Sequence, residues 1–217
     1  MTAGDPITTP PPVLAPTAYE PGGPLTAEHM DQLAQAQQRA KKLRKAGGVA
    51  MFNGCTIAVF AGLTLLFGLV SPLFGGLDVT ALVMGLGLGA IALNEFRGRQ
   101  LLRRFDRRAP RVLGLNQVGL MVLVIGYCAW MLWQVFAGPN PYAQDIARQP
   151  GLGDMLGPIG EVYKQLSLLV YGGVIAGTLI FQGLNAIYYF TRASHLRAYL
   201  DQTPPWVVEV QRRTTGS

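Results

Sequence analysis

Four long apolar runs, separated by polar segments, dominate the hydropathy pattern of the chain. They occupy residues 49–71, 77–96, 113–136 and 166–190. Each run reaches the roughly 20 residues that a helix needs to cross the hydrocarbon core of a bilayer. A helix also satisfies the backbone of an isolated run within lipid. The pattern therefore predicts an all-α integral membrane protein with four transmembrane helices in two hairpins. The first run follows a long polar leader, so we do not expect it to be a signal peptide.

The polar segments around these runs differ in composition. Residues 1–25 are rich in proline and poor in charge, which predicts a disordered leader. Residues 26–48 alternate apolar and basic positions at helical spacing, and Thr26 is a suitable N-cap, so we expect an amphipathic basic helix. Residues 137–165 are expected to form an extracytoplasmic loop of turns and short helices, and residues 191–217 a cytoplasmic tail.

Lysine and arginine lie almost entirely on one side of the expected membrane. Of the 18 basic residues, only Arg148 and Lys164 fall in the loop between the third and fourth runs. The positive-inside rule then places both termini and residues 97–112 in the cytoplasm. We expect a bacterial inner-membrane protein with this orientation. We interpret the net charge of +6 as a signal for membrane orientation. A nucleic-acid site is not expected, because no nucleic-acid recognition element accompanies the basic residues.

The segment of residues 97–112 combines seven arginines with an apolar stripe. Its apolar residues recur at helical spacing, which predicts that the second transmembrane helix continues as an amphipathic basic helix and ends before Pro110. Anionic headgroups attract such residues at about 1 kcal/mol each. We therefore expect lipid headgroup contacts from Arg97, Arg99, Arg103, Arg104, Arg107, Arg108 and Arg111.

Each apolar run carries an asparagine near its predicted cytoplasmic end. Amides in a bilayer are stabilised by bonding to one another, at about 0.6–2 kcal/mol per bond. We expect one polar layer across the bundle, which either joins the helices or lines the mouth of a pore beside Glu95. Glu95 itself is expected to pair with an arginine at the interface. The layer consists of Asn53, Asn94, Asn116, Gln117, Gln182 and Asn185.

Small residues at four-residue spacing predict surfaces where helices approach closely. The pattern leaves open whether these surfaces join helices of one chain or of two chains. The expected packing positions are Gly54, Ala58, Gly85, Gly89, Gly173 and Gly177.

A short pattern also recurs along the chain. The segments 97–110 and 192–205 share Arg, Leu, Asp and Pro at an offset of 95 residues, which favours two related hairpins.

Motifs for catalysis, cofactors and metals are missing from the sequence. No phosphate-binding loop, serine-hydrolase motif or zinc-protease motif occurs, and the two cysteines and two histidines are far apart. We expect no enzyme activity, metal or cofactor. The leading hypothesis is an oligomer-forming or accessory subunit of an inner-membrane assembly. The alternatives are a homo-oligomeric channel with an Asn/Glu mouth, and a membrane recruiter of a soluble partner through its termini.

Overall fold

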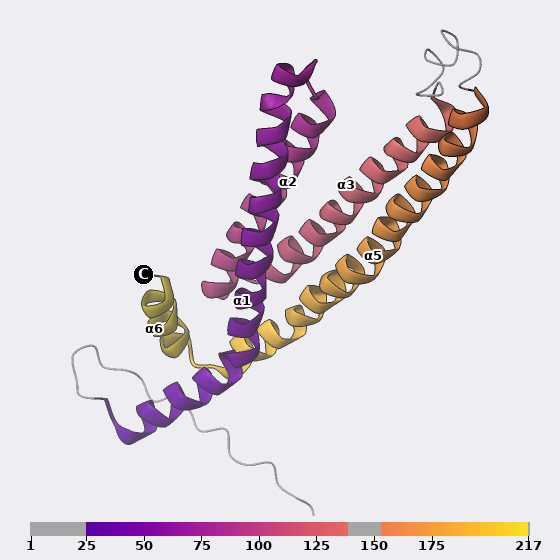
Figure 1. The fold of residues 1–217 in the computed structure, drawn as a ribbon. Helices are drawn as coiled ribbons and strands as arrows, with labels where there is room; N and C mark the ends of the chain where they lie inside the picture. Colours follow the sequence, from indigo (N-terminus) through magenta and orange to yellow (C-terminus); the bar gives the residue numbers. More distant parts are fainter. Residues whose placement is uncertain (1–24, 139–152, 217) are drawn as a thin grey trace, which may run out of the picture.

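The structure, a computed structural model, describes residues 25–138 and 153–216 (Figure 1). In this part of the chain every regular element is helical. Four of the helices are long and apolar enough to cross a membrane, which confirms the predicted all-α membrane class. The elements are α1 (Ala27–Val70), the 3₁₀ turn η1 (Ser71–Phe74), α2 (Val79–Arg103), α3 (Ala109–Ala137), α5 (Gly153–Gln202) and α6 (Pro205–Gly216).

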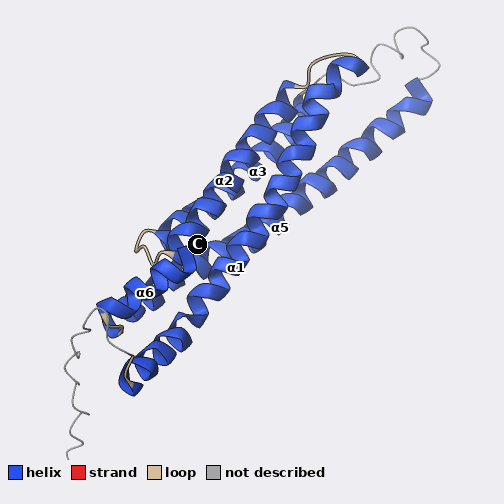
Figure 2. Cartoon of the chain, turned by 90° about the vertical axis from the view of Figure 1, so that its left-hand side faces the viewer, coloured by secondary structure: helices blue, strands red, loops and turns tan. Residues whose placement is uncertain are grey.

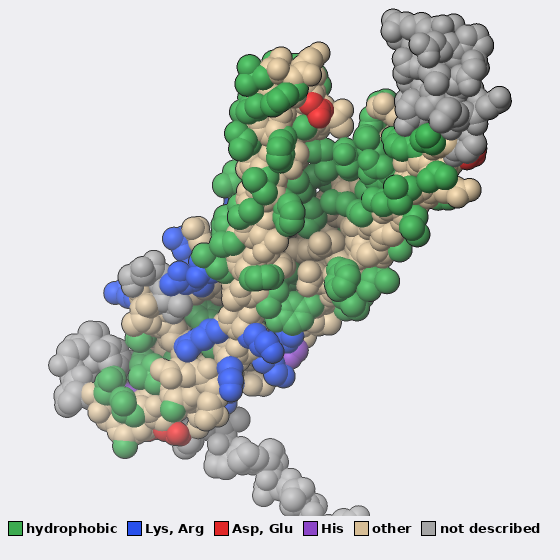
Figure 3. All heavy atoms as spheres, viewed as in Figure 1, with side chains coloured by type: hydrophobic (Ala, Val, Ile, Leu, Met, Phe, Trp, Pro, Cys, Tyr) green, Lys and Arg blue, Asp and Glu red, His purple; other side chains and the backbone are tan. Residues whose placement is uncertain are grey.

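The four long helices form two antiparallel hairpins, α1 with α2 and α3 with α5. Figure 1 shows that the hairpins converge at one end, beside α6, and lean apart toward the other end, and Figure 2 shows them running along a common direction. Lysine and arginine side chains gather around the convergent end, while apolar side chains cover most of the remaining face (Figure 3). We call the end formed by residues 39–48, 97–112 and 191–216 the basic end, and the opposite end the far end.

The helix α1 begins at a capping box and runs without interruption to Val70. The Thr26 hydroxyl accepts a hydrogen bond from the His29 amide, and the His29 ring accepts one from the Thr26 amide, each at 3.3 Å. The amphipathic helix expected over residues 26–48 and the first transmembrane helix are therefore one continuous helix. Figure 1 shows α1 changing direction near its basic end. At the far end, the turn into α2 needs Gly75, whose φ of 134° suits glycine.

The helix α2 ends at Arg103 rather than before Pro110, so that prediction is wrong. Residues 104–108 form a tight turn in which Phe105 has a positive φ of 54° and the Asp106 carboxylate accepts a hydrogen bond from the Arg108 amide at 2.8 Å. Pro110 lies in the first turn of α3, where a backbone N–H group would have no acceptor within the helix, so proline costs no hydrogen bond there. The apolar residues of this segment are buried or partly buried, as expected, but they lie in two helices and the turn between them instead of in one long helix. They are Gly98, Leu101, Leu102, Phe105 and Ala109.

The helix α5 is longer than the fourth apolar run at both ends. It begins at Gly153, so the part of the expected loop from 153 to 165 is helical, and it continues to Gln202 within the expected tail. The remainder of that loop and the proline-rich leader lie outside the described residues. Of the recurring pattern, Pro205 begins α6 and Pro110 is the second residue of α3, but Asp106 lies in a turn and Asp201 lies inside α5. The two hairpins therefore differ in local structure at these positions.

The basic end has its own hydrophobic core. Phe105 stacks on Tyr199 with ring centroids 4.6 Å apart, and this contact holds the positive φ of Phe105 in place. Arg39 donates a hydrogen bond to the Gln202 carbonyl at 2.6 Å, which joins α1 to the end of α5. The cluster is completed by the apolar seam of α1 and the apolar face of α6, and its buried members are Ala36, Ala40, Leu43, Phe105, Leu196, Tyr199, Val207 and Val208.

The small residues fall into two groups. In the first hairpin, glycines make room for the neighbouring helix: a Cβ atom at Gly54 would lie 2.8 Å from the Phe96 ring, and one at Gly85 would lie 2.6 Å from Leu65 Cγ. Ala58 packs against the cluster of Ile57, Ala92 and Leu120. A Cβ atom at Gly89, Gly173 or Gly177 would meet nothing within 4 Å in the described part of the chain.

We predict opposite effects on stability for alanine substitutions at Gly85 and Gly89, which lie four residues apart on α2. Gly85→Ala should lower stability by about 1–3 kcal/mol, because the added methyl group meets the backbone nitrogen of Leu65 at 3.0 Å and cannot be relieved by a rotamer change. Gly89→Ala, the matched control, should be neutral or stabilising by up to about 1 kcal/mol, because the site is open and alanine favours helix. Thermal unfolding in detergent checks both. Equal destabilisation by the two variants would contradict the packing described for α2.

Candidate functional site

A buried carboxyl group lies where the four spanning helices meet. Glu95 of α2 has no exposed surface. Its Oε2 accepts a hydrogen bond from Asn116 Nδ2 at 2.7 Å, and its Oε1 accepts bonds from Gln117 Nε2 at 3.1 Å and from the Tyr189 hydroxyl at 2.9 Å. Asn53 Nδ2 donates to the Tyr189 oxygen at 3.4 Å. We call these five residues the carboxyl cluster, to which α1, α2, α3 and α5 all contribute.

The expectation that Glu95 pairs with an arginine at the interface is wrong. In the described part of the chain, no ion pair includes Glu95. Helical phase explains the difference, because Glu95 shares the buried face of α2 with Ala92, Gly98 and Leu102. Arg97 lies on another face and is exposed. A carboxyl group on the buried face therefore takes its hydrogen bonds from neighbouring helices rather than from the nearest charge in the sequence.

The polar residues predicted as one layer occupy different environments. Asn53, Asn116 and Gln117 meet around Glu95, whereas Asn94 is exposed and Gln182 and Asn185 are partly buried on α5. The amides of Asn116 and Gln117 point into the carboxyl cluster, and Asn116 Nδ2 also donates to the Ile91 carbonyl at 3.0 Å.

Tyr189 was not predicted as a member of the cluster, because it lies between Tyr188 and Phe190 at the end of an apolar run, where aromatic residues are common in membrane proteins.

The carboxyl cluster is suited to joining helices. Both Glu95 oxygens already accept hydrogen bonds, and a bond between helices within a membrane contributes about 0.6–2 kcal/mol. The donors come from both hairpins, so the bonds hold α1 and α2 against α3 and α5 at one level. Within residues 25–138 and 153–216, no group of three His, Cys, Asp or Glu side chains is placed to hold a metal ion.

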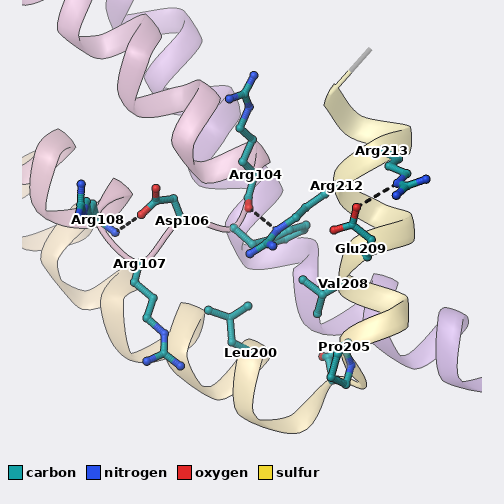
Figure 4. A pocket seen from close by; sticks show the side chains of 12 residues that line it. Arg104, Asp106, Arg107, Arg108, Leu200, Pro205, Val208, Glu209, Arg212 and Arg213 are labelled. Atoms are coloured by element: carbon teal, nitrogen blue, oxygen red, sulfur yellow. Dashed lines mark hydrogen bonds and ion pairs between the residues drawn. The ribbon is translucent and has the colours of Figure 1, made fainter. Parts of the chain in front are cut away.

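A large open pocket lies at the basic end, between the 104–108 turn and α6. Its volume is about 1170 Å³. Figure 4 shows Arg212 reaching from α6 toward the backbone of Arg104, while Arg213 turns to Glu209. The Arg212 Nε donates to the Arg104 carbonyl at 2.9 Å, and the Arg213 Nε lies 3.0 Å from Glu209 Oε1. The wall also contains Asp106, so acidic groups offset part of the positive charge of this pocket.

The seven predicted headgroup arginines surround the basic end rather than one side of a helix. Arg97 lies beside Asn94 and Val112, in a pocket between α2 and α3. Arg99 and Arg103 line a second pocket with Arg44 of α1. Arg104 lines the large pocket, Arg107 and Arg108 line both this pocket and a smaller one, and Arg111 lines only the smaller one. Arg44, Arg197, Arg212 and Arg213 belong to the same rim and were not among the predicted contacts.

Most of these arginines have no acidic partner. In the part of the chain that the structure describes, Arg107 alone among the seven forms an ion pair, with Asp201 at 3.6 Å, and both side chains are more than half exposed. Exposed pairs of this kind contribute about 0–1 kcal/mol. The positive charge of the basic end is therefore largely uncompensated by the chain.

Comparison with known proteins finds no relative of this chain: no family model, no curated protein and no solved structure matches it. The functional argument therefore depends on the geometry described above.

We predict that Glu95→Leu lowers stability by at least about 2 kcal/mol. Leucine removes the acceptor for Gln117 and Tyr189, and a buried donor without a partner costs about 1–3 kcal/mol. Asn94→Leu, one position away on an exposed face, should change stability by less than about 0.5 kcal/mol. Thermal unfolding in the same detergent compares the two. If Asn94→Leu proves the more damaging variant, the carboxyl cluster does not hold the helices together.

Proposed function

We propose that this chain is a non-enzymatic multi-pass membrane protein that acts as an oligomer-forming or accessory subunit of a bacterial inner-membrane assembly. In this proposal the basic end and both termini lie in the cytoplasm, and arginines of the basic end contact anionic lipid. The polar chemistry of the described membrane region supports a structural role, because the Glu95 oxygens and their donors are engaged with one another.

The observation that carries the proposal is the incomplete packing of the second hairpin. In the most apolar 18-residue window of α5, 6% of the residues are buried, compared with 22% in α2. On α5, a Cβ atom at Gly173 or Gly177 would meet nothing within 4 Å in the described part of the chain, so no helix of this chain approaches these glycines closely. Figure 1 shows that the hairpins diverge toward the far end, so neither hairpin covers this part of the other.

The first hairpin shows what such glycines do when a helix is available. At Gly54, Gly68 and Gly85 the neighbouring helix approaches so closely that a Cβ atom would lie within 2.8 Å of a side chain. Close approach of this kind drives helix association in membranes, where no hydrophobic force between helices exists. Gly173 and Gly177 of α5 are four residues apart, a spacing that lets a second helix approach closely, and we infer that they receive a helix of a second copy or of another membrane protein.

The channel alternative receives less support from the geometry. Asn53, Asn116 and Gln117 direct their amides to Glu95 and Tyr189, so they do not form a ring that opens to a pore within one chain. The recruiter alternative depends on the terminal segments. The leader lies outside the described residues, and the tail packs through α6 against the cluster at the basic end.

The proposed association predicts a mass larger than one chain. The gently solubilised protein should appear by native mass spectrometry as an oligomer or with a stoichiometric membrane partner. Gly173→Ile combined with Gly177→Ile should reduce that species at least about tenfold, because branched side chains prevent close approach.

The matched control is Gly119→Ile with Gly126→Ile on α3. These sites are equally open, but large residues lie four positions to either side of each. A monomer without any partner in the unaltered protein would overturn the proposal.

The orientation has its own test. Green fluorescent protein fused to either terminus should fluoresce, and alkaline phosphatase fused there should be inactive, because the positive-inside rule places both ends in the cytoplasm. Alkaline phosphatase inserted after Gly138, at the far end, should be active. The reverse pattern would place the arginines outside and would remove the basis for contacts with the anionic cytoplasmic leaflet.

A further inference from the structure

The smaller pocket at the basic end is lined by arginines and by no acidic residue. It has a volume of about 270 Å³ and lies between the start of α3 and the last turns of α5. Its lining consists of Arg107, Arg108, Arg111, Ala193, Leu196 and Arg197, and we call it the arginine pocket. We propose that the arginine pocket binds a phosphate group, supplied by the headgroup of an anionic phospholipid. The inference deepens the lipid contacts of the proposed function and rests on the chain lying in a membrane.

The charge balance distinguishes this pocket from the larger one. The large pocket contains Asp106 and Glu209 in its wall, and Glu209 already pairs with Arg213. Four of the six residues that line the arginine pocket are arginines, and in the described part of the chain only Arg107 among them forms an ion pair, with Asp201 at 3.6 Å. Cations that line one pocket repel one another, and a bound anion relieves that repulsion. The smaller pocket is therefore the stronger anion site.

The residue type also suits phosphate. Guanidinium groups present a planar fork of donors that bonds two phosphate oxygens at once, which an ammonium group cannot do. Arg107, Arg108 and Arg111 come from the turn and the first turn of α3, and Arg197 comes from α5. Donors from two helices can surround one phosphate.

The depth of the pocket favours a lipid over a soluble anion. Arg111 precedes Leu113, the first residue of the third apolar run, by two positions. Arg192 lies over the ring of Tyr188 at 4.2 Å, an arrangement of aromatic and basic side chains that is common where the hydrocarbon ends. The pocket therefore lies at the level of the headgroups, and Ala193 and Leu196 give it an apolar wall.

The test uses the full chain in nanodiscs that contain phosphatidylcholine with or without phosphatidylglycerol. Native mass spectrometry then counts the phosphatidylglycerol molecules that remain bound after release. Arg111→Gln combined with Arg197→Gln should weaken retention about tenfold or more, since each nearby arginine contributes about a factor of five. The matched control, Lys41→Gln with Lys45→Gln, removes the same charge from exposed side chains of the basic end that line none of the pockets described above, and should retain lipid like the unaltered protein.

A further double variant and two competing anions sharpen the result. Arg111→Lys with Arg197→Lys keeps the charge and loses the fork, so retention should be intermediate. Inorganic phosphate and pyrophosphate, added at millimolar concentration, should not displace the lipid. If they displace it, and also raise the unfolding temperature in pure phosphatidylcholine, the phosphate comes from a soluble ligand instead.

Equal loss of lipid in the two Gln pairs would overturn the inference, because it would show attraction to the overall charge alone. The same spectra report the oligomeric state. A monomer that still retains lipid at the pocket contradicts the proposed function but supports the arginine pocket. An intact assembly in which both Gln pairs lose lipid equally supports the proposed function but contradicts the arginine pocket.

Discussion

A carboxyl group among apolar helices needs hydrogen bonds from other side chains, and Glu95 receives them from both hairpins. Asn116 and Gln117 of α3 and Tyr189 of α5 donate hydrogen bonds to its carboxyl oxygens. Asn53 of α1 donates to the Tyr189 oxygen. Polar groups left alone in hydrocarbon are costly, so this arrangement restricts how the hairpins can be placed. Figure 1 shows that the hairpins converge at the basic end and lean apart toward the far end, where Asp78, Tyr127 and Gln134 help to line a pocket between them.

The turn between α2 and α3 at the basic end also depends on this constraint. Because the carboxyl cluster holds α2 and α3 together, the chain between them has only five residues in which to reverse direction, and Phe105 takes up a positive φ within that turn. The same turn then presents Arg104, Arg107 and Arg108 to pockets on both of its sides. The positions of these arginines thus depend on a tight turn whose Phe105 packs against Tyr199 and Leu196.

The apolar runs are sufficient to predict the four spanning helices, because twenty consecutive apolar residues leave few alternatives to a membrane helix. The end of α2 could not be predicted in this way, since the stripe from Gly98 to Ala109 fits one helix as well as it fits a hairpin. Glu95 was misplaced for a similar reason: its sequence neighbours are arginines, but its spatial neighbours are set by the rotation of α2. Tyr189 belongs to a site that the packing of α5 against α1 and α2 creates, and Arg197 belongs to one that the packing of α5 against the start of α3 creates. Spacing within one helix carries no information about that packing.

The length of α5 has a mechanical consequence. It runs for 50 residues without a break, about 75 Å at the usual helical rise, from the far end to the cluster around Tyr199. α1 likewise continues from its apolar part into the same cluster. Both helices are held at two levels, at the carboxyl cluster through Asn53 and Tyr189 and at the basic end through Leu43 and Leu196. A force that changes the angle between the hairpins at the far end therefore acts on both sets of contacts through the same two helices.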